Sequence, residues 1–149
     1  MEEAKKAFQK GEVPVGCVVV KEGQVVAKAH NRVQELKDPT AHAEMLAIRE
    51  ATKALDSKYL YGCEVYVSLE PCPMCAYALV LSRVEKVIFF APDEKYGAVM
   101  SRFNLLNEEC FNHRVRGKLL CGICPPHRIW ALEPQASVWW CCWITKGVL

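Results

Sequence analysis

Two short motifs constrain this chain more than any other feature of its sequence. The first is His42-Ala43-Glu44, and the second is Pro71-Cys72-Pro73-Met74-Cys75, after 26 intervening residues (45–70). One imidazole and two thiolates are typical zinc ligands, and three protein ligands leave one position of a tetrahedral zinc open. An open position is characteristic of catalytic zinc sites. Glu44 is close enough in sequence to move protons to and from a zinc-bound water.

The motifs also limit how the chain can fold. Within a helix, His42 and Glu44 would lie about 200° apart, so they converge on one metal only beyond the helix N-terminus. Cys72 and Cys75 share one face at the start of a second helix. The spacing therefore predicts two helix N-termini that face one metal, where the positive helix ends favour thiolates.

Hydrophobic patterning predicts strands that alternate with helices. A near-continuous apolar run indicates a strand buried on both faces, and a turn and a second strand follow it. The later strands are each preceded by a helix, and the pattern as a whole predicts a three-layer α/β/α fold with a mixed sheet. The helix over 72–82 is apolar almost all round, which indicates burial between layers or in a subunit interface. The expected strands are 13–20, 24–30, 64–68 and 86–90, and the expected helices are 2–10, one capped by Thr40 that runs to about 55, and 72–82.

Length, hydropathy and cysteine content argue against a membrane-spanning protein and against a secreted protein held together by disulfides. A chain of 149 residues is expected to form one domain, and a net charge of +2 does not by itself indicate a nucleic-acid-binding protein. No apolar run approaches the ~20 residues that span a bilayer, and the first residues do not resemble a secretory signal. The nine cysteines are irregularly spaced and odd in number, which favours thiols in a reducing, cytoplasmic setting over a disulfide framework.

Longer strings around the motifs carry a family resemblance. They include Asp38-Pro-Thr-Ala-His-Ala-Glu-Met45, Tyr66-Val-Ser-Leu-Glu-Pro-Cys-Pro-Met-Cys75 and Asn112-His-Arg-Val115. His-x-Glu followed by Pro-Cys-x-x-Cys is the known signature of zinc deaminases. The metal motif is shared across the cytidine/deoxycytidylate deaminase superfamily, but the first and last strings are closer to its tRNA enzymes. From about Ala4 to Val115 the chain resembles the bacterial tRNA-specific adenosine deaminases of this superfamily.

The resemblance implies a homodimer with one zinc per subunit, which hydrolytically converts adenosine to inosine at the wobble position of a tRNA anticodon. In this reading His42, Cys72 and Cys75 hold the zinc, and Glu44 is the general acid and base. A structural hydrogen bond is the alternative role for the histidine in the last string. The substrate-binding residues that the resemblance implies are Asn31, Ala43 (through its backbone), Asp93, Asn112 and His113.

The end of the chain departs from the family pattern. We assign 1–115 to the deaminase domain and 116–149 to an atypical tail. All four tryptophans and five of the nine cysteines lie in the last 40 residues, a shift that an altered reading frame or a divergent native tail would produce. We expect 119–124 to add a fifth strand. Cys121, Cys124 and His127 form either a second zinc site or a chance grouping.

Two other functions compete with tRNA deamination. A deaminase of a free nucleobase, nucleoside or nucleotide would share the zinc and Glu44 but would need a closed pocket, whereas a basic open groove beside Asn31 would favour RNA. A non-catalytic dimer or RNA-binding scaffold would have no need to keep Glu44.

Overall fold

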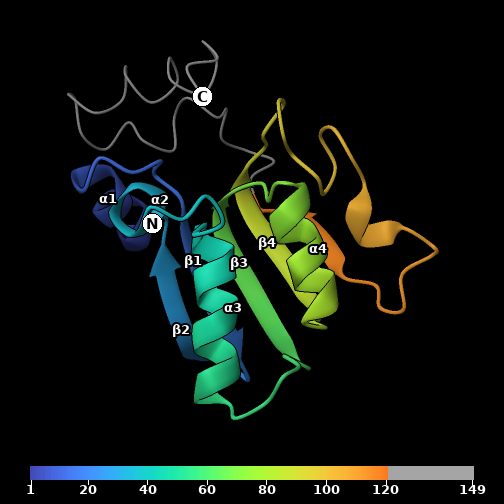
Figure 1. The fold of residues 1–149 in the computed structure, drawn as a ribbon. Helices are drawn as coiled ribbons and strands as arrows, with labels where there is room; N and C mark the ends of the chain where they lie inside the picture. Colours follow the sequence, from blue (N-terminus) through green and yellow to red (C-terminus); the bar gives the residue numbers. More distant parts are fainter. Residues whose placement is uncertain (121–149) are drawn as a thin grey trace.

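The computed structural model describes residues 1–120, which form a five-stranded sheet with helices on both faces (Figure 1). The four strands and three longer helices that the sequence predicts are all present, with their ends within three residues of those expected. The elements in chain order are α1 (Glu2–Gln9), β1 (Gly16–Lys21), β2 (Gln24–His30), α2 (Val33–Leu36), α3 (Ala43–Ala54), β3 (Cys63–Leu69), α4 (Pro73–Leu81), β4 (Lys86–Ala91), the 3-10 helix η1 (Leu105–Asn107) and β5 (Arg116–Leu119).

The sheet is mixed, and its strand order is β2-β1-β3-β4-β5. β1 pairs antiparallel with β2 and β3, whereas β4 pairs parallel with β3 and β5. A tight turn at Glu22 and Gly23 joins β1 to β2, and both residues have positive φ angles, 50° and 77°. Two-residue hairpin turns that match the twist of the strands require this conformation. α4 supplies the crossover that the parallel pair β3–β4 needs.

The side chains of β1 alternate between the two faces of the sheet. Cys17 and Val19 are fully buried in the main core, whereas Val18 and Val20 line a cavity on the opposite face. α1 crosses that opposite face at Gly16, where an added Cβ would come within 2.5 Å of a backbone nitrogen of the helix. Only glycine permits this approach. The result is the three-layer α/β/α arrangement that the sequence predicts (Figure 1).

The main core lies between the sheet and the pair α3 and α4. α3 packs with small side chains, which let its backbone approach β1 and β2 closely, while α4 contributes larger ones. The inner sides of both helices are packed on the sheet, and their N-terminal ends lie at the same end of it (Figure 1). The core residues of the two helices are Ala43, Ala47, Ala51, Ala76, Leu79 and Val80, and they meet Val65, Val67, Val87 and Phe89 of the strands.

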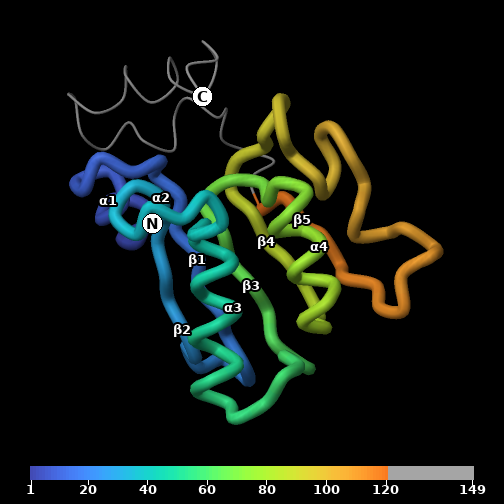
Figure 2. Tube along the Cα trace, in the orientation of Figure 1, coloured from blue at the N-terminus to red at the C-terminus, as the bar shows by residue number. Residues whose placement is uncertain are grey.

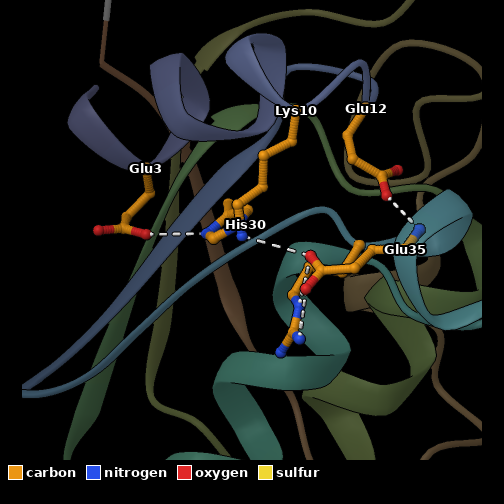
Figure 3. A network of polar contacts seen from close by, with 6 residues as sticks. Glu3, Lys10, Glu12, His30 and Glu35 are labelled. Carbon is orange, nitrogen blue, oxygen red and sulfur yellow. Dashed lines mark hydrogen bonds and ion pairs between the residues drawn. The ribbon is translucent and has the colours of Figure 1, made fainter.

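A network of polar contacts fastens α1, β2 and α2 together (Figure 3). His30 Nδ1 lies 3.2 Å from Glu3 Oε2, and Lys10 Nζ lies 3.3 Å from Glu35 Oε2. The buried Glu12 carboxylate accepts a 2.8 Å hydrogen bond from the backbone N–H of Glu35. These contacts fix the segment between β2 and α2, which carries one of the expected substrate-binding residues.

Two details at the start of α3 differ from the sequence-based expectation. Thr40 does not cap the helix, because its backbone N–H and its hydroxyl both donate to Asp38 Oδ1, over 2.8 and 2.7 Å. This local turn competes with a helix cap, and the N-cap residue is His42 instead. The short helix α2 was not predicted, since four residues give no periodic signal.

The fifth strand lies earlier than expected. β5 covers Arg116–Leu119 and pairs with β4, so the first residues of the segment assigned to the tail belong to the sheet. Its sequence, Arg-Gly-Lys-Leu, lacks an apolar pattern, as is common for a strand at a sheet edge. The group Cys121, Cys124 and His127 lies outside the described residues. Within 1–120, no helix has the length and apolar character needed to cross a membrane.

Candidate metal and catalytic site

The side chains of His42, Cys72 and Cys75 meet where the N-termini of α3 and α4 face each other. His42 is the N-cap of α3 and Cys72 the N-cap of α4, and both have extended backbones with φ near −70° (−71° and −72°). Cys75 lies in the first turn of α4. His42 Nδ1 lies 3.7 Å from Cys72 Sγ and 3.6 Å from Cys75 Sγ. The structure thus brings together the three residues that the sequence singled out.

These distances fit a tetrahedral zinc ion. Bonds of about 2.0 Å to nitrogen and 2.3 Å to sulfur place such ligand atoms about 3.6 Å apart. The three potential ligand atoms all lie within 4.8 Å of one another, and no other such cluster occurs among residues 1–120. The set is one nitrogen and two sulfurs, which suits zinc and leaves one coordination position for water or substrate.

The charges of the ligand side chains are linked to each other. Hydrogen bonds from Cys75 and then from His42 lower the pKa of Cys72 to about 4, so this thiol is ionised at neutral pH. The hydrogen bond to Cys72, and burial, raise the pKa of Cys75 well above its ordinary value. The hydrogen bond to Cys72 also raises the pKa of His42. Without a cation the site therefore holds one thiolate, and a bound metal supplies the positive charge that lets both thiols ionise.

Glu44 lies beside the three potential ligands but is not part of their cluster. Its side chain is in the first turn of α3, the residue is only 4 % exposed, and Oε2 has no hydrogen-bond partner among the described residues. Burial raises its pKa to about 7. A carboxyl group with a pKa near the working pH is suited to accept and return a proton.

Asn31 and Ala43 are held close to this centre. The N–H of Asn31 donates to Val15 O over 3.0 Å, and the N–H of Arg32 donates to Ala41 O over 3.0 Å, which joins the end of β2 to the residue before His42. Asn31 is only 4% exposed, just after the end of the strand that leads toward His42. Ala43 is the first residue of α3, where backbone N–H groups have no intrahelical acceptor. Both residues can therefore offer polar groups to a ligand.

Asp93 begins the connection between β4 and η1, which lies beside the start of α4 (Figure 2). Its Oδ1 accepts hydrogen bonds from the backbone N–H groups of Lys95 and Tyr96, over 2.9 and 3.0 Å. The N–H of Ala98 donates to Pro71 O over 2.9 Å, directly next to Cys72. The connection therefore lies next to the metal-ligand cluster. We call this segment, residues 92–104, the wall.

Asn112 and His113 lie far from the cluster within the same chain. His113 Nε2 is 2.8 Å from Val84 O, just beyond the C-terminal end of α4, and both residues line a cavity with Tyr77 and Leu81. The nine residues of α4 separate this end from the metal-ligand cluster by about 13 Å. This contact is a structural hydrogen bond, the alternative to RNA binding that was expected for His113.

Glu70 received no role from the sequence, although it stands directly before Pro71 and Cys72. The structure buries it and surrounds its carboxylate with backbone N–H groups of the wall that follows β4. An acidic residue directly after β3 and before the Pro-Cys motif was the available signal. Because its donors come from about 30 residues further along the chain, no local pattern could identify them.

The sequence pattern of the cytidine and deoxycytidylate deaminase zinc-binding region matches residues 1–91, more than half of the chain. The chain belongs to this deaminase family. Two curated relatives are tRNA-specific adenosine deaminases: one from Aquifex aeolicus, 67% identical over 78% of this chain and 77% of its own, and one from Bacillus subtilis, 56% identical over 76% and 71%.

Solved structures of other deaminases share the fold. A tRNA:A34 deaminase, studied for A-to-I editing at the wobble position of transfer RNA, superposes with a TM-score of 0.77 at 41% identity, over 80% of this chain and 87% of its own. Guanine deaminase from Bacillus subtilis superposes with a TM-score of 0.61 at 38% identity, over 69% of this chain and 65% of its own. The expected deaminase fold is confirmed.

Proposed function

We propose that this deaminase converts adenosine to inosine at the wobble position of a tRNA anticodon. The observation that carries the proposal is the 67% identity to a tRNA-specific adenosine deaminase over 116 residues, a similarity that extends over most of the chain. The 41% identity to the tRNA:A34 deaminase structure, at a TM-score of 0.77, supports the same substrate. The geometry of His42, Cys72, Cys75 and Glu44 supports hydrolytic chemistry.

We assign zinc binding to His42, Cys72 and Cys75, one ion per subunit. When bound, the ion supplies Lewis-acid activation of water. Glu44, buried and raised in pKa, would move two protons in succession: the first from the attacking water to N1 of the purine ring, and the second from the new C6 hydroxyl to the amino group, which departs as ammonia. The amide of Asn31 and the backbone of Ala43 hold the base over the centre. Exclusion of water by the packed ends of α3 and α4 keeps these polar contacts strong.

The anticodon loop suits this site because its bases are single-stranded, so that unstacking one costs only a few kcal/mol. We assign to Asp93 and its surrounding wall the contacts with nucleotides that flank the reacting base. A tRNA substrate and a site built on free thiols both support a cytoplasmic location.

We propose that two chains associate through the outer side of α4. Tyr77 and Leu81 are 42% and 58% exposed, and Tyr77 packs on Phe111 with ring centroids 5.0 Å apart. Exposed apolar side chains that cluster in this way mark interaction surfaces. Asn112 and His113 lie on the same side, so in a dimer they would contact RNA bound by the partner and not their own subunit's base.

The likeness to guanine deaminase keeps one alternative, a free purine substrate. That structure is 38% identical, and this chain covers only 65% of it. A comparison of substrates distinguishes a tRNA deaminase from a deaminase of free purines. Purified zinc-loaded protein is incubated with an anticodon stem-loop carrying adenosine at the wobble position and, separately, with free adenosine, guanine and cytidine, and the products are identified by mass spectrometry. Inosine in the stem-loop alone is expected, and turnover of free guanine alone would overturn the proposal.

A further inference from the structure

We propose that Glu70 is a positioning residue for the RNA-binding wall: its carboxylate clamps residues 93–101 onto the metal end of the site. The inference rests on the proposed function, because it assumes that this wall contacts nucleotides beside the reacting base.

The Glu70 carboxylate receives five hydrogen bonds from the wall. Oε1 accepts from the backbone N–H groups of Val99, Met100 and Ser101, over 3.1, 2.7 and 2.9 Å. Oε2 accepts from the backbone N–H of Asp93 over 3.0 Å and from the Ser101 hydroxyl. The residue is only 2% exposed, so water cannot replace these acceptors.

The clamp is joined covalently to the metal-ligand cluster. Glu70 is two residues before Cys72, and its own N–H donates to Ala91 O over 2.8 Å. Pro71 O, between them, accepts the N–H of Ala98 over 2.9 Å. The wall is therefore attached at Asp93, at Ala98 and at 99–101 to Glu70 and Pro71, the two residues before Cys72.

The backbone of the wall passes so close to the Glu70 carboxylate that one position requires glycine. A Cβ at Gly97 would lie 2.4 Å from Glu70 Oε2 and 2.5 Å from Asp93 O. Glycine is thus needed where the chain wraps around the carboxylate. All five partners are donors, and an ionised carboxylate is the side chain that offers only acceptors. An amide in its place would turn an NH₂ group toward one set of N–H donors.

The outer side of the wall carries large exposed side chains. Tyr96, Met100 and Phe103 are all exposed, and Lys95 Nζ lies 5.0 Å from the centre of the Tyr96 ring. Aromatic side chains with neighbouring basic groups are the usual platforms for unstacked bases. A fixed backbone would present this platform to the RNA at a lower entropic cost of binding.

The test compares Glu70→Gln, Glu70→Ala and Ser101→Ala with Leu60→Val. Leu60 is fully buried and precedes β3, at the end of that strand opposite Glu70, so its variant serves as the control for lost stability without lost clamp contacts. Zinc content, steady-state kinetics on the anticodon stem-loop and hydrogen exchange of the peptide covering 92–102 are measured for each zinc-loaded protein. If Glu70→Ala does not fold, Glu70→Gln and Ser101→Ala carry the test.

Glu70→Gln is expected to raise KM about tenfold, the size of one lost charge-assisted hydrogen bond, with kcat and zinc content near those of the parent. Glu70→Ala should raise KM further, Ser101→Ala less, and amide exchange in 92–102 should increase in the same order. Leu60→Val should change neither KM nor that exchange.

Equal hydrogen exchange of the 92–102 peptide in Glu70→Gln and Leu60→Val would show that the Glu70 carboxylate does not hold the wall in place. Faster exchange with an unchanged KM would overturn its role in RNA binding, as would a loss confined to kcat. A parent protein that does not deaminate the stem-loop refutes the proposed function instead, and the exchange data then still decide whether Glu70 holds the wall.

Discussion

The two ends of α4 differ in what they leave for other molecules to complete. Its first turn carries Cys72 and Cys75 among buried groups whose charges are linked, and it needs a cation. Its later part presents Tyr77 and Leu81 as exposed apolar surface, which we propose that a second copy covers. One helix therefore connects a chemical site, built within one chain, to a surface that a second copy would cover. The two ends should respond to mutation in separable ways.

The largest effect is expected at the first turn. The double variant Cys72→Ser/Cys75→Ser should lose the metal and all deamination, and should unfold at lower temperature than the zinc-loaded parent because metal binding at such a site contributes to folding. Metal content by atomic emission and thermal unfolding followed by circular dichroism measure both. Full zinc occupancy in this variant would show that other residues bind the ion.

A smaller loss is expected when Glu44 is replaced and the ligands are kept. Glu44→Ala should retain zinc and the fold but lower turnover by about 10²–10⁴-fold, the range typical for loss of general acid–base catalysis. Single-turnover rates on the stem-loop and zinc content give the answer. Loss of zinc in Glu44→Ala would mean that this carboxylate is a ligand, contrary to the assignment.

The pH dependence of metal-free protein tests the burial of the same carboxyl group. Its pKa is raised from 4.5 to about 7, so between these values the folded state binds more protons than the unfolded state. Stability should therefore fall as pH rises from about 4.5 to 7, by about 3 kcal/mol for this one group. The free energy of unfolding of metal-free Glu44→Gln, measured with urea at several pH values, should lack this fall between pH 4.5 and 7. A parallel pH profile in both proteins would contradict the buried, raised-pKa carboxyl.

The smallest expected effect on chemistry belongs to the last turn. Leu81→Lys should shift the protein from dimer to monomer in light scattering at micromolar concentration, while zinc content is unchanged. Val25→Lys is the matched control, since Val25 is also aliphatic, is about equally exposed (56% against 58% for Leu81) and lies on β2, away from α4. A parent protein that is already monomeric would remove the proposed interface.

The sequence predicts the site better than it predicts what surrounds it. His42, Glu44, Cys72 and Cys75 are identifiable because their chemistry depends on residue type and local spacing, and a helix geometry argument was enough to place them at two N-termini. The partners of Glu70 could not be predicted, because its donors are backbone groups and carry no sequence signal. The cap of α3 was misplaced for a related reason, since Asp38 and Thr40 satisfy each other locally.

The separation of Asn112 and His113 from the metal-ligand cluster was equally hidden. Their string of residues matches the family, but a matching string does not say where the chain carries it. Only the hydrogen bond from His113 to Val84 shows that the string lies at the far end of α4.

His42 and Cys72 occupy the positions where a helix normally receives a capping side chain, yet neither side chain makes a capping hydrogen bond. A missing cap weakens a helix start by about 0.5–2 kcal/mol, so both helices begin poorly until a metal holds their first residues together. The ends of α3 and α4 should thus be the first parts of metal-free protein to open to proteases. A cell short of zinc would then lose copies of this protein to degradation and would not store them for later loading, so that zinc supply would set the amount of enzyme as well as its activity.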